Sequence, residues 1–224
     1  LANYGMMLWG NIHEEYKEAS LGYGSDFSWG LKDNRGWNDH NLISYAVSHD
    51  EERLMVENLN FGNATTGYNL KDSGTALLRQ ELTATFLVSV PGPKMIWQFD
   101  ELGYDYSIEF NGRTGNKPIR WDYLEDARRY RLHQVYSAIT KLKTSSTTFA
   151  TANYNVDVSG YGKSIHLNHS DMDATIVGNF KMDMLNMIPS FQHTGMWYDY
   201  ITGDSLNVTD VNMSIDFLPG EYHV

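Results

Sequence analysis

The spacing of apolar and polar residues changes character well past the middle of the chain. Up to residue 143, short apolar runs alternate with segments in which apolar residues recur every three or four positions. The first pattern is typical of buried strands and the second of amphipathic helices. The runs predict strands over residues 6–9, 42–47 and 94–97, and helices over residues 12–20, 73–90 and 127–143. This alternation predicts a parallel sheet covered by helices.

Local signals support the two longer helices. Ser73 is a suitable N-cap for the helix over residues 73–90, and Pro91-Gly92-Pro93 ends it. The apolar residues of the last helix recur at helical spacing on one face: Leu132, Val135, Ile139 and Leu142. Both helices therefore have a side that must be buried against other elements.

The Ser- and Thr-rich residues 144–148 precede a second half without helical periodicity. The strands expected there cover residues 163–168, 174–180, 197–201 and 213–217. Short strands separated by Gly, Asn and Asp predict an antiparallel β domain. Strand alternation places Trp197 and Tyr198 on opposite faces. We expect an α/β domain over residues 1–146, followed by an all-β domain over residues 147–224.

Composition narrows the class of protein. Of the 224 residues, 42% are hydrophobic and 20% are charged, as in ordinary globular domains. The net charge of −11 repels phosphate backbones and anionic lipids, so we expect no nucleic-acid partner and no membrane partner. The absence of cysteine excludes disulfides, thiolate zinc sites and cysteine nucleophiles.

The chain shows no pattern for a cofactor or a metal ion. His166 and His169 are three residues apart in an expected strand, which places them on opposite faces and argues against a shared metal. The first ten residues, LANYGMMLWG, lack the basic segment of a signal peptide. We expect sequence preceding Leu1 to be missing, and we leave the localisation open, with the cytoplasm favoured.

Candidate chemistry follows the second expected strand. Ser48-His49-Asp50 comes directly after its last apolar residue, and functional residues of parallel sheets gather at the carboxyl ends of strands. A paired imidazole and carboxylate can bind hydroxyl groups, and an ionised carboxylate stabilises positive charge that develops nearby. In the alternative interpretation, Asp50 caps the following segment and forms an ion pair with Arg53.

A second set follows the third expected strand. Asp100 and Glu101 occupy the equivalent strand end, and Tyr104 lies close behind them. Carboxylates bind sugar hydroxyls, and aromatic rings stack on sugar faces. Solvated or capping carboxylates and packed aromatic rings are the alternative for these residues.

Longer segments resemble one known family. The succession of SHD at a strand end, PGPKMIWQFDELGYD after a helix, NKPIRWDY and a long helix resembles the C-terminal part of the alpha-amylase family of retaining glycoside hydrolases. GMMLWGNIHEEYKEASLGYG is similar to the sixth strand and helix of that family's barrel. FQHTGMWYDYITGDSLNVTD and FLPGEYHV are similar to its closing β domain. The resemblance covers essentially the whole chain.

This resemblance implies a partial (β/α)8 TIM barrel, with strands six to eight and their helices, followed by an antiparallel β-sandwich. It implies that Asp50 stabilises the oxocarbenium-like transition state and that His49 binds the same sugar hydroxyls. Asp100, Glu101 and Tyr104 would bind substrate. Ser48 and Phe99 depart from the family, in which many members have Asn and Gly.

The resemblance also implies what this chain lacks. The family's nucleophile and acid/base lie on strands four and five, upstream of the segment that matches Leu1. We therefore expect an inactive C-terminal piece of an enzyme that acts on α-1,4-linked glucans, without cofactor, whose partner is the N-terminal barrel half. A branching enzyme or another transglycosylase is one alternative. A non-catalytic carbohydrate-binding module is the other.

An incomplete barrel has open edges. The strands over residues 6–9 and 94–97 would each lack one neighbour, which exposes backbone hydrogen-bonding groups and apolar faces. We expect the isolated chain to associate with itself through these edges.

Overall fold

The computed structural model describes all 224 residues. The α-helices are α1 (His13–Leu21), α2 (Leu54–Phe61), α3 (Ser73–Ser89) and α4 (Ala127–Ser145). Short 3₁₀ helices cover Ala2–Tyr4, Phe27–Gly30, Asp33–Arg35, Asp100–Leu102, Trp121–Glu125 and Thr147–Ala150. The strands before α4 are β1 (Leu8–Asn11), β2 (Leu42–Tyr45), β3 (Ala64–Thr65) and β4 (Tyr68–Asn69). Those after it are β5 (Tyr154–Asp157), β6 (Gly162–Leu167), β7 (Ala174–Asn179), β8 (Leu185–Met187), β9 (Gly195–Tyr198), β10 (Ser205–Val208), β11 (Ile215–Phe217) and β12 (Tyr222–His223).

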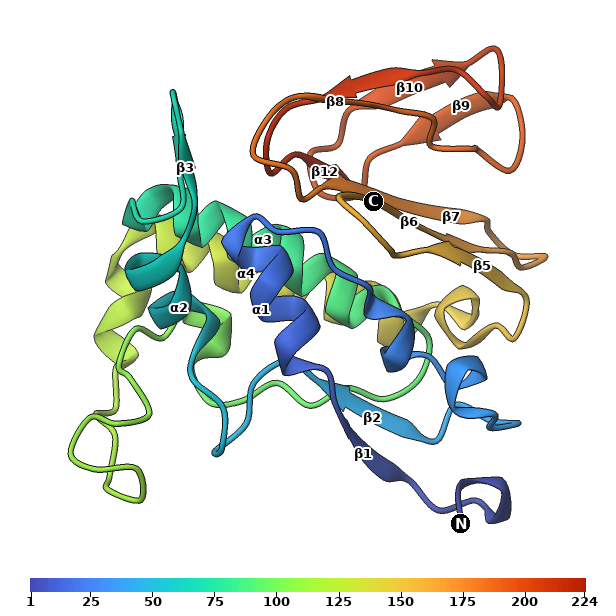
Figure 1. Cartoon of the computed structure of the whole chain (residues 1–224). Coiled ribbons are helices and arrows are strands. Elements are labelled where there is room, and N and C mark those ends of the chain that lie inside the picture. Colours follow the sequence, from blue (N-terminus) through green and yellow to red (C-terminus); the bar gives the residue numbers. More distant parts are fainter.

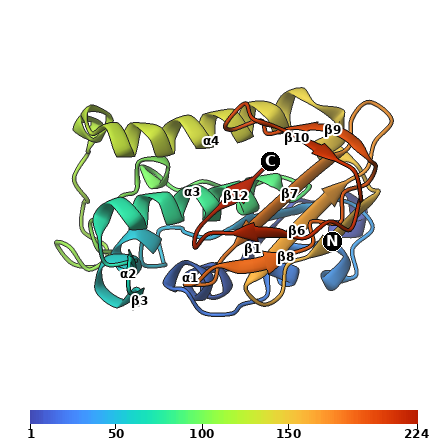
Figure 2. The same ribbon diagram turned by 90° about the horizontal axis from the view of Figure 1, so that it is seen from above.

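These elements stack in successive layers. Figure 1 shows β1 and β2 below the helices, the sheet that contains β5, β6 and β7 on the other side of the helices, and β8, β9 and β10 outermost. Seen from above, α3 and α4 run side by side (Figure 2). The helical layer is therefore covered on two sides by strands.

The parallel sheet of the first half is confirmed for two strands. β1 pairs with β2 in parallel, with Leu8 opposite Leu42 and Asn11 opposite Tyr45. Gly10 lets the two strands pack closely, because a Cβ atom at this position would lie 2.3 Å from Leu42 Cδ1 and Leu42 would have to move. The two strands form an open sheet, and no closed barrel is present.

The third expected strand, over residues 94–97, is wrong. Lys94 forms a single parallel bridge to Ser44, and Met95 N donates to Ser44 O at 3.1 Å. Pro93 has no N–H with which to extend the ladder backward. No further strand lies on the other side of this segment to hold it extended.

Three smaller expectations also need correction. β1 begins two residues later than expected, because Met6 and Met7 are exposed and unpaired in the sheet. α2 and the β3–β4 hairpin were not expected. Asp72 is the N-cap of α3 in place of Ser73, because its carboxylate accepts a hydrogen bond from Thr75 N. These are short-range features that apolar periodicity does not resolve.

The second half is antiparallel, as expected. The strand order of its main sheet is β12-β7-β6-β5, and β9–β10 and β8–β11 form separate two-stranded ribbons. In β9 the half-buried Trp197 and the exposed Tyr198 lie on opposite faces.

One hydrophobic core extends across the expected boundary at residues 146 and 147. Its largest cluster of buried residues combines Tyr16, Phe27 and Phe86 of the helical half with Ile176 and Phe180 of the β half. Phe27 stacks on Tyr16 at 4.0 Å and meets Phe180 edge-on at 5.4 Å between ring centroids. The two halves therefore bury their apolar surfaces against each other.

Two buried cations bind carbonyl groups from both halves. Arg79 of α3, fully buried, donates to Ala19 O and Ser20 O at the end of α1, and to Phe180 O after β7. The ammonium of Lys163 donates to Ser25 O at 2.6 Å, Val158 O at 2.7 Å and Gly160 O at 2.9 Å. These hydrogen bonds join the β half to the end of α1, to α3 and to the loop at Ser25.

The opposite side of the molecule is open. On the face of β1 and β2 that points away from the helices, Trp9 is 59% exposed and contacts Tyr45 edge-on at 5.7 Å. No helix of the structure combines the length and the apolarity needed to cross a membrane.

Candidate functional site

The turn that follows β2 presents His49 and Asp50 to solvent. Their side chains are 64% and 69% exposed, and His49 Nε2 lies 3.3 Å from Asp50 Oδ2. The residues before them, Ala46, Val47 and Ser48, are buried, so the chain emerges from the core just where the pair begins. The structure thus brings the two expected residues together on an accessible surface.

Asp50 does not pair with Arg53. The guanidinium of Arg53 is buried, and its Nη1 donates to Ser48 O at 2.9 Å and Glu51 O at 2.8 Å. The N-cap of α2 is Arg53 itself, without a side-chain cap. The alternative interpretation of Asp50 as a cap and ion-pair partner is therefore wrong, and its carboxylate has no partner besides His49.

Glu51 fastens the turn to the neighbouring strand. One of its oxygens accepts from Asn11 Nδ2 of β1 at 2.5 Å, and the other accepts from Ser48 Oγ. Charge-assisted hydrogen bonds of this kind are short and strong. They set the position of the turn relative to β1.

Glu52 fastens the turn to a distant loop. Its carboxylate accepts from Ser107 Oγ at 2.6 Å and from Ile108 N at 2.9 Å. Arg113 of the same loop donates from Nη2 to Asp50 O at 2.5 Å and pairs with Glu109 at 3.2 Å. The backbone of Asp50 is thereby held from both sides.

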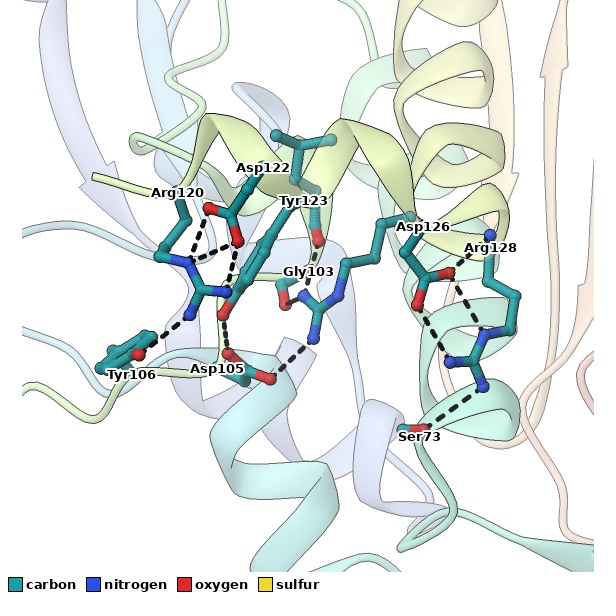
Figure 3. A network of polar contacts seen from close by, with 11 residues as sticks. Ser73, Gly103, Asp105, Tyr106, Arg120, Asp122, Tyr123, Asp126 and Arg128 are labelled. Carbon is teal, nitrogen blue, oxygen red and sulfur yellow. Dashed lines mark hydrogen bonds and ion pairs between the residues drawn. The ribbon is translucent and has the colours of Figure 1, made fainter. Parts of the chain in front are cut away.

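A polar network holds this loop at its base (Figure 3). Arg120 forms a two-pronged ion pair with Asp122 and donates to Tyr106 Oη at 2.9 Å. Tyr123 donates from its hydroxyl to Asp105. Asp105 also pairs with Arg129 of α4 at 2.6 Å. The loop that contacts Asp50 is therefore anchored to a helix.

Two features beside the pair bear on ligand binding. The ring of Trp97 lies 5.8 Å from that of His49, and its Nε1 is buried without a hydrogen-bond partner. Asp50 also lines a hollow of about 510 Å³ between α1, α2 and the loop, together with Glu51, Glu52, Glu57 and Glu109. Burial raises the pKa of Glu57 above its ordinary value. The acidic lining favours neutral or cationic ligands over anions.

Asp100 and Tyr104 do not lie on this surface, which corrects the expectation that they bind substrate. Asp100 is buried and accepts from the Tyr136 hydroxyl at 3.0 Å, and burial raises its pKa to about 6. Tyr104 is 1% exposed, and its hydroxyl donates to Pro118 O. Helix α4 and the polypeptide after residue 117 cover both side chains.

Glu101 remains partly exposed. It lines a separate surface hollow with His133 and Lys141 of α4, and no residue of the His49–Asp50 turn lines that hollow.

Sequence reasoning missed the residues that hold the pair in place. Glu51 and Glu52 were visible only as part of an acidic run, and Arg113 lies 63 residues from the carbonyl that it binds. An Asn at the end of the preceding strand, Asn11, is the one local signal that points to a partner for this run. No group of three or more His, Asp or Glu side chains is arranged to hold a metal ion.

Comparison with known proteins identifies the fold. No family model matches the sequence, and no curated protein matches it either. Among solved structures, an alpha-amylase from Geobacillus thermoleovorans in complex with acarbose has a TM-score of 0.69 at 12% identity and covers 94% of this chain and 45% of its own. The catalytic module of the glycogen-degrading pneumococcal virulence factor SpuA has a TM-score of 0.68 at 8% identity, with coverages of 97% and 43%.

A gamma-CGTase from alkalophilic Bacillus clarkii has a TM-score of 0.65 at 13% identity, with coverages of 88% and 28%. The chain thus spans less than half of the length of these structures while almost all of it is matched. It has the fold of part of an alpha-amylase-like enzyme, consistent with a C-terminal part.

Proposed function

We propose that this chain is the C-terminal part of an alpha-amylase-like glycoside hydrolase that acts on α-1,4-linked glucans. The observation that carries the proposal is the accessible His49–Asp50 pair at the carboxyl end of β2, within a fold similar to that of such enzymes. Two similar solved structures support the substrate class, because the Geobacillus thermoleovorans alpha-amylase is in complex with acarbose and AmyP is in complex with maltotriose.

In the proposed mechanism, Asp50 acts on charge that develops in the transition state. Its carboxylate has no protein partner besides His49, so both oxygens can approach the hydroxyls beside the reacting carbon. Hydrogen bonds at these hydroxyls strengthen as the sugar becomes oxocarbenium-like. His49 binds the same hydroxyls, and Trp97 shapes the wall behind it.

Retention of configuration needs two further carboxyl groups, a nucleophile and an acid/base, about 5–5.5 Å apart. We propose that sequence preceding this chain supplies both and that it closes the face of Trp9 and Tyr45. The chain alone is then inert. Glu101 stays in the proposal as an outer substrate contact, whereas Asp100 and Tyr104 do not.

Glycosyl transfer in place of hydrolysis is the second candidate. It is favoured by the similarity to the gamma-CGTase and to CldA, a cyclomaltodextrin glucanotransferase with a TM-score of 0.67 at 16% identity. Both reactions use the same covalent intermediate and differ in the acceptor. Analysis of products from maltoheptaose distinguishes the two.

The test uses the longer protein that contains this chain. We expect Asp50→Asn to lower kcat on soluble starch by about 10²–10³-fold with little change in KM, because the charge acts mainly in the transition state. Asp39→Asn is the matched control, since Asp39 is also exposed. Equal losses in kcat and in substrate affinity, or full activity of Asp50→Asn, would contradict the proposed role.

A further inference from the structure

A second hollow lies inside the β domain, away from the His49–Asp50 turn. It has a volume of about 530 Å³ and opens between the main sheet and the two outer ribbons. The ribbons β9–β10 and β8–β11 are not hydrogen-bonded to each other, so the outer layer is split. We name this hollow the interlayer cavity. Its volume lies within the range of small-molecule sites, about 300–1,000 Å³.

Apolar side chains from several strands form its walls. Val177 of β7 closes it from the main sheet, and Ile215 and Phe217 close it from β11. Trp197 and Leu206 lie opposite each other in the β9–β10 ribbon and both line the cavity. Leu206 remains 37% exposed, so the cavity is reachable from solvent.

The polar side chains of the cavity are carboxylates, hydroxyls and one imidazole, that of His223, which is paired with Asp199 and Glu221. Asp199 is occupied, because it pairs with His223 at 2.5 Å and accepts from Ile201 N and Thr202 N. The side chains of Asp204, Ser205 and Ser214 line the cavity and take part in no hydrogen bond within the protein. No Lys or Arg lines it.

The carboxylates and apolar walls of the cavity together favour one class of ligand. Its carboxylates repel phosphates, fatty acids and other anions. A glucosyl unit fits both parts of the surface, because its C–H faces pack on apolar and aromatic walls while its hydroxyls donate to carboxylates.

We propose that the interlayer cavity binds one or two glucosyl units of an α-glucan, as a binding site separate from the His49–Asp50 face. The identity of the ligand rests on the proposed function, whereas the cavity and its charge do not. Such a site holds a polymer chain on the enzyme while another stretch of it reacts.

The test measures binding of maltoheptaose to the whole chain by titration calorimetry. We expect one weak site in the wild type. Asp204→Ala, which removes a free acceptor, and Leu206→Trp, which fills the opening, should each weaken binding by about tenfold or more. Asp183→Ala is the matched control, because Asp183 is exposed in the same domain and does not line the cavity. Circular dichroism of each variant verifies folding.

The outcomes separate this inference from the proposed function. Loss of binding in Asp204→Ala and Leu206→Trp but not in Asp50→Asn supports the cavity site. Loss only in Asp50→Asn, or no binding at millimolar maltoheptaose, overturns the cavity site and leaves the role of Asp50 to the activity test. Binding of decanoate without binding of maltoheptaose also overturns it.

Discussion

The two sides of the helical layer differ in how completely they are closed. Toward the β domain, Phe27 and Phe86 pack on the sheet, and Arg79 and Lys163 satisfy carbonyls of both halves. Toward β1 and β2, Trp9 is exposed and a strand edge is unpaired. One side of the helical layer is therefore covered by a packed interface, whereas the sheet on the other side has an exposed face and an unpaired edge.

Buried charged side chains also differ in the hydrogen-bond partners that surround them. On the closed side, buried cations are surrounded by carbonyl acceptors. By contrast, Asp100, which follows residues 94–97, is buried with one hydroxyl partner, Tyr136, and burial raises its pKa to about 6. Carbonyl groups around Arg79 and Lys163 thus have charged donors, whereas the buried carboxyl group of Asp100 has a single hydroxyl donor.

The largest expected effect comes from removing a cation from the closed side. Arg79→Met leaves the carbonyls of Ala19, Ser20 and Phe180 without their donor. We expect a loss of about 3 kcal/mol in the free energy of unfolding, measured by urea denaturation. Arg128→Met is the control, because its ion pair with Asp126 is exposed and its loss should cost less than about 1 kcal/mol. Equal effects of the two changes would contradict a special role for the closed side.

We expect the free energy of unfolding to depend on pH through Asp100. Between about pH 4 and pH 6, folded Asp100 retains a proton that the unfolded chain has released, so stability falls as pH rises through this window. Asp100→Asn should remove on the order of 2 kcal/mol of this decline. Urea denaturation at pH 4 and pH 7 measures it, with Asp39→Asn as the control. A decline that persists unchanged in Asp100→Asn would show that other groups cause it.

The hydrogen bonds of Glu52 that hold the His49–Asp50 turn against the loop at Ser107 should have a smaller, local effect. Glu52→Ala removes the acceptor of Ser107 Oγ and Ile108 N. We expect a loss of about 1–2 kcal/mol and faster amide hydrogen exchange at Ile108. Glu109→Ala is a useful comparison, because Glu109 binds only the Arg113 side chain of the same loop. Unchanged exchange at Ile108 in Glu52→Ala would contradict this role of Glu52.

The open face should govern association with almost no effect on stability. Trp9→Glu places a charge on the exposed face of β1 and should shift the chain from oligomer to monomer in light scattering at micromolar concentration. Its free energy of unfolding should change by less than about 0.5 kcal/mol. Met184→Glu, at an equally exposed methionine of the β domain, should leave association unchanged. A monomeric wild type would contradict the expected self-association.

The sequence predicted helix ends accurately where helical spacing of apolar residues extends over many turns. α3 and α4 lie within two residues of their predicted ends, because many turns of apolar spacing agree. α2 has only eight residues and begins with three consecutive apolar ones, Leu54, Met55 and Val56, which do not show a helical period. The strand over residues 94–97 failed for another reason, since a strand also depends on neighbours that local sequence does not describe.

Local sequence also predicted some residues of the candidate site correctly and others wrongly. His49 and Asp50 were found because their exposure follows from a strand end, which is a local property. The burial of Asp100 and Tyr104 depends on Tyr136 and Pro118, which lie far along the chain. The contact of Arg113 with Asp50 O is equally non-local. The spacing of residues along the sequence does not show which distant residues come into contact in the fold.

The packing of the helical layer is closed toward the β domain and open toward β1 and β2. Native-state amide hydrogen exchange of the dilute, monomeric chain measures both sides in one experiment. We expect amides of α3 and β7 to exchange at least about 10²-fold more slowly than those of β1. Equal protection of β1 and β7 would contradict it, because β1 would then be as firmly held as the closed interface.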